Sequence, residues 1–180
     1  MKKRIKIDVI NTCNLDKKVI DFFKSYDFEL VETQNEILKF RQSSSLLDAW
    51  KTNPLKWGSE ISILLSDKTI VAEFIVDTDA QMNTNEEKKV WETFIENFKN
   101  YVVSGKTLNS KLASAISESK ESRLSYFGWA FFGTLIGGFL FLIYTKLTKN
   151  SSSLNLLLIP IMTTLFLSWR IKFKKTKNAI

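Results

Sequence analysis

The stretch YFGWAFFGTLIGGFLFLIY, from Tyr126 to Tyr144, contains no charged residue and holds ten Phe, Leu or Ile residues. About 20 helical residues, each rising roughly 1.5 Å, cross the ~30 Å hydrocarbon layer of a bilayer. No central charge opposes insertion, which such a charge would disfavour by about 3 kcal/mol. A chain of 180 residues has too little protein to surround this helix in a soluble core. We therefore predict a transmembrane helix over residues 126–144.

A second apolar run follows shortly after the first. The segment from Asn150 to Trp169 also lacks charge, and we predict a second transmembrane helix over residues 154–169. Pro160 interrupts this run, because a proline inside a helix removes one backbone donor. An in-plane or re-entrant segment is the alternative. Only residues 145–153 separate the two runs, so we expect them to form an antiparallel hairpin.

The distribution of charge favours a membrane over nucleic acid as the partner. The formal net charge is +7. Of the 26 Lys and Arg residues, seven follow residue 125, so residues 1–125 carry 19 basic residues against all 19 acidic ones. The seven flank the apolar runs, as is typical of membrane anchors; they are Lys146, Lys149, Arg170, Lys172, Lys174, Lys175 and Lys177.

The basic residues also predict the orientation of the chain. Five of them follow Trp169, and only two lie between the runs. Because Lys and Arg concentrate on the cytoplasmic side, we expect a multi-pass protein of the inner (plasma) membrane with both termini in the cytoplasm and residues 145–153 outside it. The start, MKKRIKID, does not have the apolar run of a signal peptide. In the tail, residues 170–180, the candidates for contact with anionic lipid headgroups are Arg170, Lys172, Lys174, Lys175 and Lys177.

Small residues form two adjacent rows on the first apolar run. Gly133 and Gly137 make a GxxxG pair, and Ala130, Thr134 and Gly138 make the second row. Together they predict a flat face that another helix backbone can approach closely. The partner of this face is the second helix of the same chain, a second copy in a homo-oligomer, or another membrane subunit.

The preceding residues, 1–105, have the pattern of an α+β domain. Alternating apolar residues predict strands, and apolar residues at helical spacing predict two amphipathic helices with Asn14 and the capping box of Thr84 and Glu87 at their starts. The expected strands are 4–10, 28–32, 37–41, 60–65 and 70–76, with a short helix over 46–51 that Pro54 ends. We expect a cytoplasmic domain with an antiparallel sheet and both long helices on one face.

Two further segments have a predicted role. Residues 106–125 are rich in Ser, Lys and Glu with a thin apolar line, which predicts a solvated juxtamembrane linker helix. Trp50 and Trp57 lie in an irregular segment around Pro54. They either pack over the edge of the sheet or form an exposed recognition patch for a cytoplasmic protein, since Trp anchors many interfaces.

The sequence offers few residues for catalysis. Without histidine the chain has no His-dependent triad and no His-ligated metal site. Its one cysteine, Cys13, has no neighbouring base of the usual kind, and no glycine-rich phosphate loop is present. Asp77 and Asp79 are the one close acidic pair with a metal-like spacing and are weak candidates for Mg²⁺ or Mn²⁺. A polar strand end is the commoner cause of such a pair, and we expect no cofactor.

These observations favour a non-enzymatic membrane-anchored adaptor or accessory subunit whose cytoplasmic domain binds or senses a partner. Two alternatives remain open at this point. In one, the hairpins assemble through the glycine face and permeabilise the membrane. In the other, Asp77 and Asp79 serve an enzyme that acts on a lipid-linked substrate.

Overall fold

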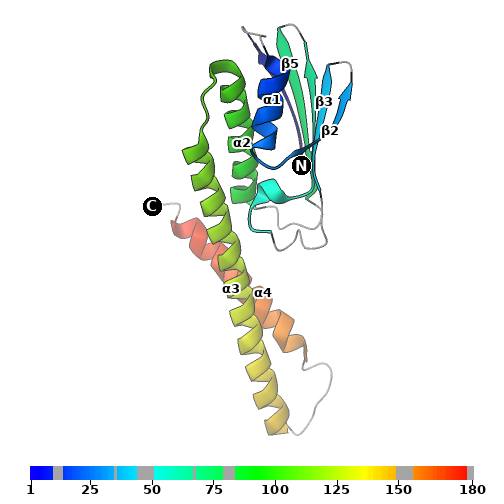
Figure 1. Cartoon of the computed structure of the whole chain (residues 1–180). Coiled ribbons are helices and arrows are strands. Elements are labelled where there is room, and N and C mark those ends of the chain that lie inside the picture. Colours follow the sequence, from blue (N-terminus) through cyan, green and yellow to red (C-terminus); the bar gives the residue numbers. More distant parts are fainter. Residues whose placement is uncertain are drawn as a thin grey trace. The chain divides into compact units, whose positions relative to one another are not determined.

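A computed structural model of the chain (Figure 1) describes residues 1–9, 14–34, 36–43, 51–66, 68–78, 84–148 and 156–177, with the backbone alone at residues 148 and 171–177. The chain divides into two compact units, Met1–Lys120 and Glu121–Ile180. The predicted short helix over 46–51 falls almost wholly on residues outside this description.

The first unit is built on a five-stranded antiparallel sheet with the order β1-β5-β4-β3-β2 (Figure 1). Its strands are β1 (Lys2–Asp8), β2 (Glu29–Gln34), β3 (Ile37–Gln42), β4 (Ser59–Leu65) and β5 (Thr69–Val76). Ile61 pairs with Phe74 and with Phe40, so that one row of apolar side chains crosses the centre of the sheet. The alternating pattern in the sequence therefore predicted the buried face of the sheet.

Two helices cover that face, α1 (Leu15–Lys24) and α2 (Asn85–Ser104) (Figure 1). The capping box predicted for α2 is confirmed. The Thr84 amide donates to Glu87 Oε2 at 2.7 Å, and the Glu87 amide donates to Thr84 Oγ1 at 3.3 Å. Gly105, with a φ of 70°, ends the helix in the left-handed conformation that glycine adopts readily. The α+β architecture expected from the sequence is thus present.

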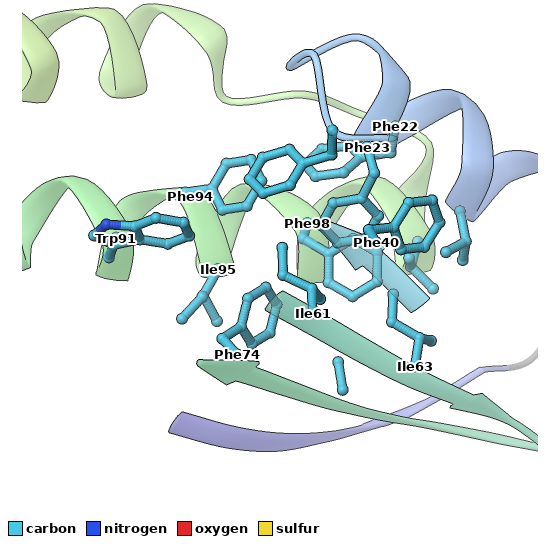
Figure 2. Close-up of a cluster of buried hydrophobic side chains, with 14 of the residues drawn as sticks. Phe22, Phe23, Phe40, Ile61, Ile63, Phe74, Trp91, Phe94, Ile95 and Phe98 are labelled. Atoms are coloured by element: carbon cyan, nitrogen blue, oxygen red, sulfur yellow. The ribbon is translucent and has the colours of Figure 1, made fainter. Parts of the chain in front are cut away.

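Aromatic rings from both helices fill the space above the sheet. Figure 2 shows Phe23, Phe40, Phe74, Phe94 and Phe98 gathered between the helices and the strands. Phe23 stacks on Phe40 with ring centroids 4.6 Å apart, and its centroid lies 5.0 Å from that of Phe98. Burial of each ring stabilises the fold by roughly 2–3 kcal/mol relative to exposure. This core supports the first unit.

One local prediction in this unit, the cap at Asn14, differs from the structure. Asn14 precedes α1 with a φ of 54°, and its side chain makes no capping hydrogen bond. Pro54 begins a short 3₁₀ helix, η2 (Pro54–Lys56), where its missing amide proton has no role in the first turn. Asn53 caps η2 by accepting a hydrogen bond from the Leu55 amide at 3.1 Å.

The third helix, α3 (Asn109–Thr148), includes most of the linker predicted over 106–125 and the whole of the first apolar run. The first turns of α3 belong to the first unit. One side of these turns is packed against the domain, where Leu112 and Ala115 are buried. Two ion pairs join it to α2: Lys111 to Glu96 at 2.8 Å and Lys89 to Glu118 at 2.6 Å. Residues 109–120 are therefore more closely attached to the domain than the solvated linker that we expected.

A buried polar network fixes the start of α3. The fully buried side chain of Asn97 donates to Tyr26 Oη at 2.8 Å and accepts from the Leu108 amide at 2.5 Å. Tyr26 in turn donates to Asn109 Oδ1 at 2.9 Å. Burial raises the pKa of Tyr26 above its ordinary value, which the hydrogen bond from Asn97 partly opposes. The network satisfies an amide at the helix start that has no partner within the helix.

The fourth helix, α4 (Leu158–Lys177), belongs to the second unit. Pro160 lies in its first turn, where a missing amide proton breaks no helical hydrogen bond, so the interruption expected in this run does not arise. Among the described residues, one helix, α3, is long and apolar enough by length and composition to cross a membrane. The apolar part of α4, Leu158–Arg170, is shorter, at about 20 Å. The predicted second span is therefore not confirmed.

Candidate functional site: the paired helices α3 and α4

Two glycines bring the backbone of α3 against that of α4. A Cβ atom added to Gly133 would lie 2.8 Å from the Cα of Thr163, and one added to Gly137 would lie 2.7 Å from the Cα of Ile159. These separations are shorter than a side-chain carbon and a backbone carbon tolerate, so glycine is required at both positions. Of the three partners left open for the GxxxG pair, the structure thus favours the second helix of the same chain.

A pair of threonines joins the two helices beside the glycines. Thr134 Oγ1 and Thr163 Oγ1 lie 3.1 Å apart. Each hydroxyl is also 2.9 Å from a backbone carbonyl of its own helix, that of Ala130 for Thr134 and that of Ile159 for Thr163. For Gly138, in contrast, no atom of the described residues lies within 4 Å of an added Cβ. Three of the five predicted packing residues therefore contact α4, Ala130 contributes its carbonyl, and Gly138 lies outside the contact.

The contacts show that the two helices run antiparallel. Gly137 is opposite Ile159, Gly133 is opposite Thr163, and Ser125 is opposite Arg170. Residue numbers therefore rise along α3 as they fall along α4. The two helices of a hairpin have this antiparallel direction.

Arg170 is held against α3 by three interactions. Its Nε donates to Ser125 Oγ at 3.0 Å, one Nη donates to the carbonyl of Ser122 at 2.8 Å, and the guanidinium carbon lies 3.3 Å from the centroid of the Tyr126 ring. Only 6% of the residue is exposed. The other Nη is buried without a hydrogen-bond partner among the described residues. Arg170 thus joins the two helices. The sequence predicted only a contact with lipid headgroups for this residue.

The rest of the predicted basic tail lies outside the side-chain description. The backbone of α4 continues through Lys172, Lys174, Lys175 and Lys177. Where these four side chains point is not described. Their contact with anionic lipids stays a prediction.

An apolar groove runs along the helix pair near Arg170. Its volume is about 490 Å³. The residues that line it are Ser125, Gly128, Trp129, Phe132, Phe166 and Trp169. The Phe166 ring lies near three of the other rings, with centroid distances of 6.0 Å to Trp129, 6.0 Å to Phe132 and 6.4 Å to Trp169. We call this feature the aromatic groove.

Large apolar side chains also cover the outside of α3. Phe139 is 65% exposed and Leu142 is 64% exposed, and many neighbours are similar. Of the 18-residue apolar stretch of this helix, only 11% is buried within the structure. A soluble core helix would be mostly buried, because exposed apolar area costs about 25 cal/mol per Å². This surface therefore hints at membrane association.

The predicted metal-binding pair is only half described. Asp77 follows β5, and its amide donates to the Gly58 carbonyl at 2.9 Å. It lines an open pocket of about 430 Å³ together with Arg41, Glu60 and other residues at that end of the sheet. Asp79 lies outside the described residues. Within the part of the chain that the structure describes, no group of three or more His, Cys, Asp or Glu could hold a metal ion.

Trp57, one of the two proposed recognition residues, is buried. Its Nε1 donates to the Lys51 carbonyl at 3.3 Å, and its ring belongs to the core of the first unit. This favours packing over recognition for Trp57. Trp50 lies outside the described residues, so its predicted role stays open.

Ser122 and Ser125, which accept hydrogen bonds from Arg170, are not among the site residues predicted from the sequence. Ser122 and Ser125 lie three residues apart and therefore share a helix face. Ser122 accepts through its backbone carbonyl, which any residue offers, so the available signal was Ser125 alone, just before Tyr126. The composition of residues 106–125 indicates only a polar linker.

Comparison with protein-family models finds no match for this chain, and comparisons with curated proteins and with solved structures find none either.

Proposed function

We propose that the chain is a non-enzymatic membrane-anchored adaptor or accessory subunit. The apolar part of α3 anchors it, and the α+β unit at residues 1–120 binds a cytoplasmic protein. One observation carries the proposal: a helix long and apolar enough to cross a bilayer, with side chains such as Phe139 and Leu142 turned outward. Lipid is the solvent in which such a surface is stable.

The finer part of the proposal is a two-helix hairpin. The antiparallel pairing of Gly133 with Thr163 and of Gly137 with Ile159 supports it, because small residues at the contact are how helices associate in lipid. The concentration of basic residues after Trp169 supports cytoplasmic placement of both termini. The expected location is the inner (plasma) membrane.

The mechanism that we propose is localisation. A partner bound to a domain held at the membrane has a raised effective concentration for whatever else lies on that surface. The adaptor therefore needs no chemistry of its own.

We favour this proposal over the permeabilising alternative. That alternative required the glycine face to join separate chains, whereas Gly133 and Gly137 are occupied by α4 of the same chain.

Membrane fractionation tests the anchor. The full chain should pellet with membranes and resist alkaline carbonate. The double variant Leu135→Lys and Phe139→Lys should become extractable, because each charge in the middle of a span costs about 2.5–3.5 kcal/mol. The matched control, Val31→Lys with Val103→Lys, alters two similarly exposed apolar residues of the first unit and should stay in the membrane. A wild-type chain recovered in the soluble fraction without detergent would overturn the proposal.

A reporter fused after Ile180 tests the orientation. Both termini are expected to behave as cytoplasmic, and an external signal from the C-terminal fusion would rule out the hairpin.

Co-purification in mild detergent, comparing the full chain with the extractable double variant, then tests recruitment. A partner should move to the membrane fraction only with the anchored chain.

A further inference from the structure

We propose that the aromatic groove binds the acyl chain of an anionic phospholipid whose phosphate neutralises Arg170. The inference rests on the membrane anchoring proposed above. It adds a bound lipid of defined class at a defined position.

The groove has the size and lining of a small-molecule site. Its volume of about 490 Å³ lies within the roughly 300–1,000 Å³ typical of ligand pockets. Trp129, Phe132, Phe166 and Trp169 supply apolar walls, and Trp rings are characteristic of the level where headgroups meet acyl chains. Gly128 leaves space, because an added Cβ would meet no atom within 4 Å in the part of the chain that the structure describes.

Charge selects the class of lipid. The Arg170 guanidinium lies beside the groove, since it binds Ser125, which lines the groove, and it follows Trp169 directly. No Asp or Glu occurs after Glu121 in the sequence, and no carboxylate pairs with Arg170 among the described residues. A buried cation without a counter-ion is strongly unfavourable. A phosphate supplies the missing negative charge, and four lysines follow within residues 172–177.

Continuity with the lipid-facing surface favours a lipid over a peptide in this groove. Phe132 lines the groove and is itself exposed, as are Phe131 and Leu135 next to it on α3. An acyl chain lying across this surface enters the groove without leaving the apolar environment. Basic pockets between helices on the cytoplasmic side are where anionic headgroups bind in membrane proteins generally.

Native mass spectrometry of the full chain tests the proposal. The protein in mild detergent is offered equal amounts of phosphatidylglycerol and phosphatidylcholine with the same acyl chains. We expect the wild type to retain the anionic lipid about fivefold or more over the zwitterionic one, the factor associated with one basic contact. Gly128→Leu, which fills the groove, should retain at least tenfold less lipid than the wild type. Gly138→Leu is the matched control, because its added side chain also meets open space but lies outside the groove.

A second pair of variants tests the charge independently of the groove. Arg170→Lys should keep the preference for phosphatidylglycerol, and Arg170→Gln should abolish it. Equal retention of the two lipids by the wild type, or equal retention by Gly128→Leu and Gly138→Leu, would overturn the lipid site. Flotation of the wild type with phosphatidylcholine vesicles separates this failure from that of the anchor: a floating protein without the preference overturns only the lipid site, and a protein that does not float overturns both.

Discussion

Thr134 on α3 and Thr163 on α4 place their side-chain oxygens 3.1 Å apart, beside the two glycine contacts that bring the helix backbones together. This relationship defines the register of the pair. It also assigns the small-residue face of α3 to an intrachain contact.

Cysteines at these two positions should form a disulfide within one chain. In a Cys13→Ser background, Thr134→Cys with Thr163→Cys is expected to oxidise to a faster-migrating monomer, because the replaced oxygens are already within contact distance. Gly138→Cys with Thr163→Cys is the control and should stay reduced, since nothing lies within 4 Å of a Cβ at residue 138. Covalent dimers formed by Thr134→Cys alone would show instead that this face joins two copies.

Enlarging Gly137 should separate the helices. In Gly137→Leu the new Cβ would meet the Ile159 backbone at 2.7 Å, and a backbone atom cannot move aside as a flexible side chain does. Overpacking of this kind costs about 1–3 kcal/mol, which corresponds to roughly a 5–150-fold loss of the packed state. The yield of the disulfide between residues 134 and 163 measures this loss. Gly138→Leu should leave the yield unchanged, and an equal yield in both variants would contradict the packed hairpin.

The network at the start of α3 makes a third prediction. Asn97→Ala removes the acceptor of the Leu108 amide and the donor to Tyr26, and a buried polar group left unpaired costs about 1–3 kcal/mol. Amide hydrogen exchange should therefore quicken by roughly 5–150-fold in the first turns of α3. Asn100→Ala changes the same residue type on the same helix, outside the network, and serves as the control. Unchanged protection at Leu112 in Asn97→Ala would show that the network does not hold the helix.

Much of the fold could be predicted because its signals are local. Ile61 and Ile63 alternate with Glu60 and Ser62 along their strand, and the capping box at Thr84 and Glu87 is fixed by four consecutive positions. The exact partner of a helix face is not local. Gly133 and Gly137 offer the same flat surface to α4, to another copy or to another subunit, so the sequence left three partners open.

Other features depended on where a helix begins or on distant contacts. Pro160 looked disruptive because the apolar run starts at Asn150, but α4 begins at Leu158 and so places the proline in its first turn. Arg170 resembles every other basic residue beside a span. Its bond to Ser125, 45 positions earlier, becomes visible only when the helices are paired. The site was therefore less predictable than the domain.

The Lys89–Glu118 ion pair predicts how the attachment of α3 to α2 depends on pH. The hydrogen bond and the charge of Lys89 hold the pKa of Glu118 below its ordinary value of 4.5. A lowered pKa in the folded state means that the ionised carboxylate stabilises the fold above the ordinary pKa, and that this contribution disappears as the pH falls through the folded-state value.

The thermal midpoint of the full chain in detergent should therefore decrease between about pH 6 and about pH 3 by more in the wild type than in Glu118→Gln. Both residues are exposed to solvent, so the difference should be small and should shrink further in high salt. Glu92→Gln, an exposed residue of α2 without an ion pair among the described residues, should follow the wild type, and an identical pH response in Glu118→Gln would refute the assignment.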